Sequence, residues 1–171
     1  MTLDKQEEKT GEKKEVQYRN LDSTLCNVPL ETDFQLWLSQ LCEEKGIDYS
    51  LMIAIAEKES NFNPEAVSST GDYGLWQINK INHKELKEVY GDNMDFFNPY
   101  DNARAAVWIL CQLMEKYGDI NKVLMAYNMG EAGAGRLWEQ GIYKSEYSDD
   151  VQAKAYWYKN NFFIAKTGSS Q

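Results

Sequence analysis

The acidic residue Glu59 has the type and the position needed for proton transfer. It stands in the segment "EKESNFNPEAVSSTGDYGLWQIN", residues 57–79, which predicts Glu59 in the last turn of a helix. There the macrodipole disfavours a negative charge by about 0.3 to 1 kcal/mol. The helix end, partial burial and apolar neighbours such as Phe62 and Trp76 would raise its pKa, as a general acid near neutral pH requires. A glutamate at this position is more often a solvated surface residue, so both interpretations stay open at this point.

The elements that must hold Glu59 are predicted from apolar spacing, caps and turns. Residues 32–46 predict an amphipathic helix with Thr32 as its cap, and residues 48–60 predict an apolar, buried helix. "DYGLWQIN", residues 72–79, predicts a short strand that forms half of a small hairpin. We expect this hairpin to lie beside the helix that ends at Glu59.

The second half of the chain predicts further helices. Asn98 and Pro99 form a good entry for a helix that is apolar on most sides and therefore central. The aromatic tract "YWYKNNFF" is expected to pack in the core, although its rings could also stack on sugars. Three more helices are predicted after this central helix: one from Asp119 to about "YNMG", a short one over 131–140, and a last one that opens at Ser148.

The patterns together predict the α+β fold class, predominantly α-helical, with one tiny β element. Residues 1–20 alternate Lys and Glu with almost nothing to bury, which predicts a charged, disordered linker. Residues 21–171 are expected to form a single domain, since the chain has 171 residues and is 43% hydrophobic, enough for one core.

Composition excludes several classes of function. The net charge of −9 lacks the basic footprint of a nucleic-acid-binding protein. The longest apolar run, "AAVWILC", is too short to cross a bilayer. The first residues are charged where a signal peptide needs an apolar stretch, so we expect that an export signal has been trimmed or that another segment delivers the protein.

Cysteine and histidine give no sign of a metal or cofactor. Cys26, Cys42 and Cys111 allow one pair and leave one over, which argues against a disulfide-dense scaffold. Whether Cys26 and Cys42 pair stays open, and Cys111 is expected to be a buried thiol. His83 is the only histidine and has no partner motif, so neither a metal site nor a catalytic triad is expected.

Three ordered blocks resemble the lytic transglycosylases, the SLT-type catalytic domains of the lysozyme-like superfamily. "ESNFNPEAVSSTGDYGLWQIN" is similar to the family's Glu-Ser, polar turn and Gly-Leu-Met-Gln strand. "NPYDNARAAVWIL" resembles its Asn-Pro-x-x-Asn helix, and "AYNMG" resembles Ala-Tyr-Asn-Ala-Gly. The resemblance covers about residues 33–160 and implies a lysozyme-like fold.

The resemblance also implies a substrate and a mechanism. Lytic transglycosylases cut the β-1,4 bond between N-acetylmuramic acid and N-acetylglucosamine in peptidoglycan with one glutamate and no metal. By this likeness Glu59 would protonate the leaving oxygen and then accept the proton of the muramoyl C6 hydroxyl as that hydroxyl attacks C1. The product would carry a 1,6-anhydro-muramoyl end.

Four further residues are implied to contact the substrate. By the same likeness Ser68 and Gln77 would hold the muramoyl group and its acetamido arm, Tyr127 would bond near the catalytic carboxyl, and Asn128 would shape that loop. Each has a structural alternative, since Ser68 suits a turn and Tyr127 suits a core with its hydroxyl satisfied.

The chain departs from the family pattern at several positions. Trp76 and Met129 stand where the family has Met and a small residue. The family's later Glu-Thr-Arg-x-Tyr-Val stretch is matched only by Tyr147 and Val151, and Tyr143 occupies the place of its glutamate. No catalytic role is assigned within this stretch.

A second resemblance leaves the reaction open. "DYGLWQIN" is also similar to the strand of animal c-type lysozymes, in which the aspartate is the second carboxylate. By this likeness Asp72 is a candidate nucleophile or electrostatic stabiliser, and the reaction would be the hydrolysis of a muramidase. An ordinary turn role is the structural alternative for Asp72. A catalytically silent glycan-binding module is the alternative from another class of protein.

The expected partner follows from these resemblances. Peptidoglycan glycan strands would be bound at an extracytoplasmic location, in the cell wall. Neither a nucleic acid nor a membrane span in this chain is expected. A secretion or conjugation machinery and a phage particle are contexts that the sequence leaves open.

Overall fold

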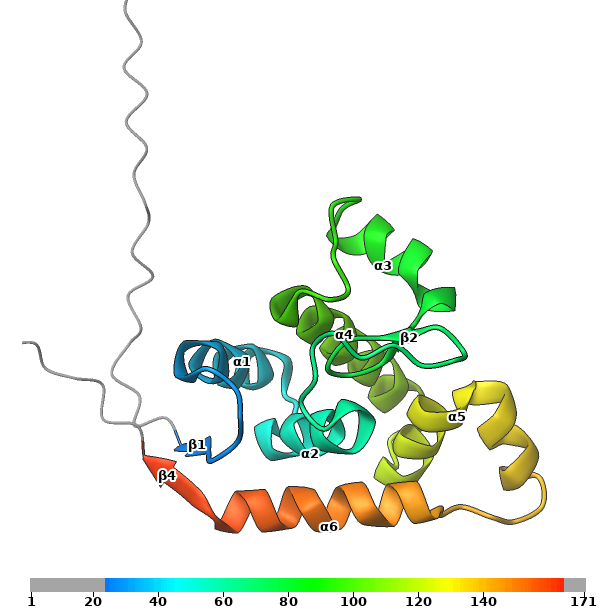
Figure 1. Cartoon of the computed structure of the whole chain (residues 1–171). Coiled ribbons are helices and arrows are strands. Elements are labelled where there is room, and N and C mark those ends of the chain that lie inside the picture. Colours follow the sequence, from blue (N-terminus) through cyan, green and yellow to red (C-terminus); the bar gives the residue numbers. More distant parts are fainter. Residues whose placement is uncertain (1–23, 165–171) are drawn as a thin grey trace, which may run out of the picture.

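The computed structural model describes residues 24–164, which form a mostly helical fold with two small sheets (Figure 1). The predicted linker over residues 1–20 lies outside the described residues. The predicted α+β fold class is confirmed. The elements are β1 (Thr24–Cys26), α1 (Thr32–Lys45), α2 (Tyr49–Ser60), β2 (Asp72–Tyr73), β3 (Ile78–Asn79), the short 3₁₀ helix η1 (Lys80–Asn82), α3 (His83–Tyr90), α4 (Pro99–Tyr117), α5 (Ile120–Trp138), α6 (Glu146–Asn160) and β4 (Phe162–Ile164).

Helix α4 lies at the centre of the fold, as its sequence predicts. It packs against α1, α5 and β3. Ala103, Ala105 and Ala106 are fully buried on it, so neighbouring elements approach its backbone closely. Helix α2 is buried from Ser50 to Ala56 and belongs to the same hydrophobic cluster. The core therefore holds the end of α2 in a fixed place.

Three of the predicted capping residues begin helices as expected. Oδ1 of Asp48 accepts a hydrogen bond from the backbone N–H of Ser50 at 2.8 Å. Asn98 and Asp119 cap α4 and α5 in the same way. Each side chain satisfies a backbone donor that the start of a helix leaves without an intrahelical partner.

Two predicted helix starts are wrong. Glu31, not Thr32, occupies the cap position of α1, and it makes no side-chain capping bond. Helix α6 begins earlier than Ser148, because Ser145 is its N-cap. The hydroxyl of each of these two serines accepts the backbone N–H of the other, which forms a capping box.

The segment 72–79 contains both strands of the hairpin, so the prediction that it supplies one strand is wrong. Asp72 on β2 pairs with Asn79 on β3 in an antiparallel register. Leu75 and Trp76 lie buried in the turn between the strands. Their hydropathy therefore reflects core packing rather than an extended strand.

Helix α3 and the strands β1 and β4 were not predicted. Helix α3 has only eight residues, and Leu86 is its one buried side chain, although Val89 and Tyr90 follow Leu86 at helical spacing. Strands β1 and β4 form an antiparallel pair in which Thr24 lies opposite Ile164 (Figure 1). No helix within residues 24–164 is long and apolar enough to cross a bilayer.

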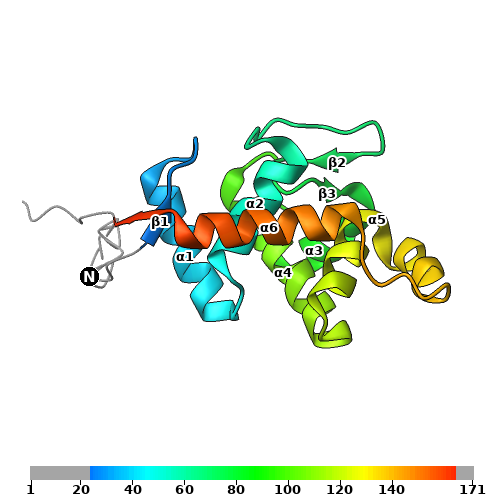
Figure 2. The ribbon, with the colours of Figure 1, turned by 90° about the horizontal axis from the view of Figure 1, so that it is seen from below.

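Helix α6 runs antiparallel to α2 along one side of the molecule (Figure 2). Lys58 near the end of α2 pairs with Asp150 near the start of α6 at 2.6 Å. Asp48 before α2 pairs with Lys159 near the end of α6 at 3.4 Å. Such exposed pairs contribute only about 0 to 1 kcal/mol each. They nevertheless show that α6 starts where α2 ends.

Helix α5 is interrupted where the sequence predicts two helices. Gly130 has a φ of 75° and a ψ of 155°, which no helix interior allows. The residues on either side of it are helical. The "YNMG" block therefore ends the first part of α5 with a kink, and residues 131–138 form the second part.

Predictions for the thiols and for the aromatic tract are partly wrong. All three cysteines are free: Cys26 and Cys42 are buried but unpaired, and Cys111 is only half-buried.

In the aromatic tract, Tyr156 and Trp157 are 73% and 58% exposed, so they do not pack in the core. Neighbouring residues on a helix point in different directions, and α6 has only one side on the core.

Candidate active site

Glu59 lies in the last turn of α2 with its side chain half-buried. Its Oε1 accepts a hydrogen bond from the hydroxyl of Tyr147 at 2.5 Å. Burial raises the pKa of Glu59 above its usual value, the Tyr147 hydroxyl opposes this, and the negative charge of Asp72 adds to it. Glu59 therefore keeps its proton to a higher pH than an exposed glutamate does.

The chain turns sharply after Glu59, so that α2 ends against the hairpin. Asn61 and Phe62 both have left-handed φ values, 50° and 63°. The N–H groups of both residues reach back to carbonyls of the last turn of α2. The hydroxyl of Ser60 donates to the carbonyl of Leu75 at 2.8 Å, which ties the helix end to the hairpin turn.

Asp72 lies on β2 within a cluster of side-chain donors. Its Oδ2 accepts hydrogen bonds from the hydroxyls of Ser68 and Thr70, the latter at 2.5 Å. Its Oδ1 accepts one from Nδ2 of Asn79, its partner on β3, at 2.6 Å. Burial alone would raise the pKa of Asp72, but the three hydrogen bonds together lower it. Asp72 therefore stays ionised where Glu59 holds a proton.

Buried Asn102 anchors the hairpin to α4. Its Oδ1 accepts from the N–H of Trp76, and its Nδ2 donates to the carbonyls of Tyr73 and Phe96, all at 2.8 Å. A Cβ atom at Gly74 would lie 2.4 Å from the Phe96 oxygen, and φ there is 77°, so this position requires glycine. The second asparagine of "NPYDN" thus positions the strand that carries the aspartate.

Ser68 and Gln77, which the resemblance assigns to substrate, both make contacts within the protein. The hydroxyl of Ser68 donates to the Asp72 carboxylate and accepts the backbone N–H of Asp72 at 3.0 Å. Nε2 of Gln77 donates to the carbonyls of Ala66 and Gly74 at 3.1 and 2.9 Å. Both residues lie at the hairpin, Ser68 as a ligand of Asp72 and Gln77 as a brace of the turn.

Tyr127 lies near the two carboxylates but bonds to the backbone. Its hydroxyl donates to the carbonyl of Trp76 at 2.8 Å. Burial raises the pKa of Tyr127 well above its usual value, and the charges of Glu59 and Asp72 add to this. Asn128, the next residue on α5, is exposed. The structure therefore brings Tyr127 to the site and leaves the side chain of Asn128 at the surface.

Tyr147 is the site residue that the sequence reasoning did not select. Burial raises its pKa far above the usual range for a tyrosine, and the charge of Glu59 adds to this, so its hydroxyl remains a donor. Its match to the tyrosine of the family's Glu-Thr-Arg-x-Tyr-Val stretch was the available signal. The sequence could not show that α6 begins beside the end of α2.

His83 has a structural place. Its ring stacks on Phe96 with centroids 3.6 Å apart, and its Nε2 lies 3.2 Å from the carbonyl oxygen of Ile78. Burial lowers the pKa of His83, so the neutral form is favoured. Within the described part of the chain, no group of three or more His, Cys, Asp or Glu side chains has the arrangement of a metal site.

Comparison with known proteins identifies relatives of this chain. Protein IpgF of Shigella flexneri is 36% identical over 111 residues, which are 62% of this chain and 72% of IpgF. The peptidoglycan transglycosylase gp16 of Escherichia phage T7 is 30% identical over 144 residues, 82% of this chain. The chain spans only 11% of the length of that phage protein.

Solved structures and a family model extend this result. The 70 kDa soluble lytic transglycosylase of Escherichia coli has the same fold, with a TM-score of 0.64 and 20% identity over 77% of this chain and 24% of that one. The model of the transglycosylase SLT domain matches residues 38–151, which include both carboxylates, the hairpin, Tyr127 and Tyr147. The chain therefore belongs to the transglycosylase SLT domain family.

Proposed function

We propose that the chain is the catalytic domain of a peptidoglycan lytic transglycosylase. It breaks the β-1,4 bond between N-acetylmuramic acid and N-acetylglucosamine and leaves a 1,6-anhydro-muramoyl end. The observation that carries the proposal is Glu59, half-buried at the end of α2 with a raised pKa, beside the hairpin and in contact with Tyr147. Membership of the SLT domain family supports the same reaction.

Glu59 acts first as an acid and then as a base. In its protonated form it gives its proton to the bridging oxygen as the bond between C1 of the muramoyl group and that oxygen breaks. The resulting carboxylate then accepts the proton of the C6 hydroxyl while that oxygen bonds to C1. Glu59 ends protonated as it began, and no water is consumed.

Tyr147 serves both steps through one contact. Its hydroxyl donates to Oε1 of Glu59, so Oε2 is the oxygen that can carry the proton toward the substrate. The same bond stabilises the carboxylate that forms after the first proton transfer. Tyr147 is thus a positioning residue. Burial raises the pKa of Glu59 for the acid step, and the Tyr147 hydrogen bond limits that rise so that the carboxylate can act in the base step.

Asp72 is assigned an electrostatic role. Its three hydrogen bonds keep it ionised, so its negative charge can stabilise the positive charge that develops at C1 in an oxocarbenium-like transition state. The same charge helps to keep Glu59 protonated. Ser68 acts through Asp72 by holding its carboxylate in place.

Gln77, Tyr127 and Asn128 complete the proposed substrate contacts. The amide nitrogen of Gln77 is occupied by two backbone carbonyls, which leaves its amide oxygen to accept an acetamido N–H of the sugar. Asn128 is exposed beside Tyr127 and offers both a donor and an acceptor. Tyr127 shapes the site by fixing the carbonyl of Trp76.

Peptidoglycan as substrate implies an extracytoplasmic site of action, at the cell wall. The phage T7 relative is described as a peptidoglycan transglycosylase, and a relative from Enterobacteria phage PRD1 as a transglycosylase. We propose that the domain works within a larger assembly of the secretion, conjugation or phage type.

Digestion of purified sacculi tests the proposed reaction. The protein is incubated with sacculi, and the soluble muropeptides are analysed by mass spectrometry. Products lighter by one water than the corresponding reducing muropeptides are expected, because the C6 hydroxyl replaces water as the attacking group. Reducing ends would show hydrolysis instead, and the absence of release from a folded, sacculus-binding protein would show a glycan-binding module.

A further inference from the structure

Trp76 lies in the turn of the hairpin and contacts four helices. It is fully buried. Its backbone N–H donates to Asn102 on α4, and its carbonyl accepts the hydroxyl of Tyr127 on α5, both at 2.8 Å. Its ring packs beside that of Phe34 on α1, with the centroids 6.3 Å apart. Its indole Nε1 donates to the carbonyl of Met52 in α2 at 2.9 Å.

We propose that Trp76 is a positioning residue for the reaction: its indole N–H holds the hairpin that carries Asp72 at a fixed place beside the helix that carries Glu59. The inference rests on the proposed function, in which Glu59 is the acid. Trp76 stands where the family pattern has methionine, and a thioether has no hydrogen to donate. The indole of this chain therefore adds a bond that the family pattern does not supply.

The acceptor of this bond lies in a part of α2 that the core holds in place. Met52 is fully buried, and α2 is buried from Ser50 to Ala56. Met52 and Glu59 are seven residues apart in the same helix, so they lie on one side of it, about two turns or roughly 10 Å apart. A hairpin bonded to the Met52 carbonyl is therefore fixed relative to Glu59.

A second bond joins the same two elements at the end of α2. The hydroxyl of Ser60, the residue after Glu59, donates to the carbonyl of Leu75 at 2.8 Å. This bond alone would let the hairpin turn about a single point. Because Trp76, the neighbour of Leu75, bonds to α2 about two turns away from Ser60, the two bonds together also fix the direction of the hairpin.

The position of Trp76 is passed to Asp72 through a very short hairpin. Each strand has only two residues, and Asp72 pairs with Asn79 across them. The turn that contains Trp76 therefore places both the Asp72 carboxylate and the amide that donates to it. Burial raises the pKa of Glu59, and the negative charge of Asp72 adds to this. A hairpin that moves away from α2 should weaken both effects.

Two replacements separate the N–H of Trp76 from its bulk. Trp76→Phe keeps an aromatic ring but is smaller and has no donor. Benzothienylalanine, incorporated in place of Trp76, keeps the shape of the indole and has sulfur where the indole has N–H. The substrate is soluble, uncross-linked peptidoglycan strands, and the pKa of Glu59 is followed by the carbon NMR signal of its carboxyl.

Both replacements are expected to slow the reaction and to change the acid. We expect kcat to fall about tenfold, because small misplacements of reacting groups are costly, and KM to change by less than about twofold. The pKa of Glu59 is expected to fall, since Asp72 and the cover of the hairpin are no longer held beside it.

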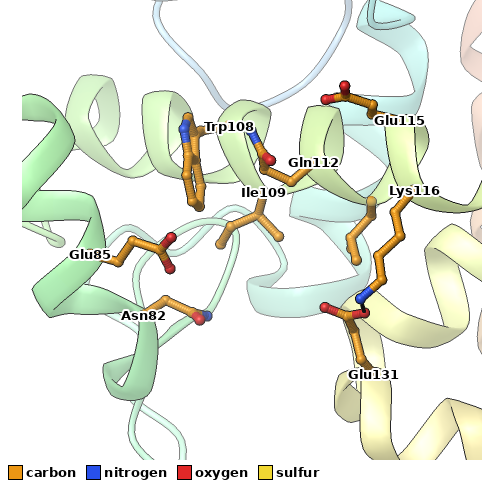
Figure 3. A pocket seen from close by; sticks show the side chains of 9 residues that line it. Asn82, Glu85, Trp108, Ile109, Gln112, Glu115, Lys116 and Glu131 are labelled. Atoms are coloured by element: carbon orange, nitrogen blue, oxygen red, sulfur yellow. Dashed lines mark hydrogen bonds and ion pairs between the residues drawn. The ribbon is translucent and has the colours of Figure 1, made fainter.

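Trp108→Phe is the matched control. Trp108 is a half-buried tryptophan of α4 that projects into a cavity of about 530 Å³ between η1, α3, α4 and α5 (Figure 3). Neither Glu59 nor Asp72 lines this cavity. The same exchange of indole for phenyl is therefore expected to leave kcat and the pKa of Glu59 unchanged.

The inference is overturned if the benzothienylalanine protein has the native kcat or the native pKa of Glu59, since Trp76 would then only fill the core. This protein decides the matter even if Trp76→Phe does not fold. An equal effect of Trp108→Phe would also overturn the inference. Failure of the proposed function looks different: the native protein then releases reducing ends, or nothing, from sacculi, while the pKa of Glu59 still reports on the bond made by Trp76.

Discussion

Glu59 and Asp72 are two carboxyls near enough for their charges to interact, yet their surroundings have opposite effects. Glu59 ends a helix and receives one side-chain hydrogen bond, from Tyr147. Asp72 begins a strand and receives three, from a loop and from the partner strand. Burial is the largest single influence on both, but only at Asp72 do the hydrogen bonds together outweigh it.

The contrast teaches how one site holds an acid and an anion at the same pH. A helix end offers a carboxyl few donors, because the backbone N–H groups there are already bonded within the helix. A hairpin flanked by a Ser- and Thr-containing turn offers several donors close together. The secondary structure that carries each residue thus sets its protonation state, and the charge of Asp72 reinforces the difference.

The largest expected effect comes from removing the acid itself. Glu59→Gln keeps the shape and the acceptor for Tyr147 but cannot donate a carboxyl proton. Release of muropeptides from sacculi should fall by about 10² to 10⁴-fold or more. Circular dichroism and urea unfolding should show an intact fold. Substantial residual release would remove Glu59 from its proposed role.

Removal of Asn102, which anchors the hairpin, should disturb the strand that carries Asp72 and not the helix that carries Glu59. Asn102→Ala leaves the N–H of Trp76 and two carbonyls buried without partners. At about 1 to 3 kcal/mol for each unsatisfied group, we expect a loss of at least about 3 kcal/mol in the free energy of unfolding. Urea denaturation measures it. A loss below about 1 kcal/mol would show that water or rearrangement replaces this anchor.

The pH dependence of stability should separate the two carboxyls. The lowered pKa of Asp72 means that its stabilisation is present above its unfolded pKa, about 3.9, and is lost as the pH falls through its folded value. The raised pKa of Glu59 means the reverse: its stabilisation is present below its unfolded pKa, about 4.3, and is lost as the pH rises through its folded value.

Two neutral variants check this sign difference. At neutral pH, Asp72→Asn should unfold at lower urea than the native protein, whereas Glu59→Gln should be at least as stable as the native protein. Near pH 3 the deficit of Asp72→Asn should shrink. Asp72→Asn should reduce muropeptide release only modestly if the transglycosylase mechanism holds. A severe loss of rate in a well-folded Asp72→Asn protein, with reducing ends in the residual product, would favour the muramidase reaction.

The smallest effect is expected from a change at Tyr147, which is the side-chain hydrogen-bond donor of Glu59. Tyr147→Phe removes the hydrogen bond that favours the carboxylate, so the pKa of Glu59 should rise further. The alkaline limb of the pH–rate profile should therefore move to higher pH, because Glu59 then keeps its proton to a higher pH. An unchanged or lowered limb would show that Tyr147 does not act through that carboxyl.

Local signals in the sequence predicted much of the fold. Asp48, Asn98 and Asp119 cap helices as expected, because a capping bond depends on residues only two or three positions apart. The end of α2 just after Glu59 and the position of the hairpin beyond it also follow from local turn chemistry. The predicted start of a helix was wrong where two residues within one turn could both cap it, as at Ser145 and Ser148.

Contacts between distant segments could not be predicted in this way. Tyr147 meets Glu59 across 88 positions of sequence, and that contact depends on the antiparallel packing of α6 on α2. The donor cluster around Asp72 depends on strand register, which the sequence left open when both strands were read as one.

The pairing of β1 with β4 has a mechanical consequence. Thr24 lies opposite Ile164, so a longer polypeptide would enter and leave this unit at one point. Tension applied through both ends would break the hydrogen bonds between β1 and β4 one at a time before any force reached α2, the helix that carries Glu59. Force from neighbouring parts of such a polypeptide would thus separate β1 from β4 first, and Glu59 and Asp72 would keep their relative positions.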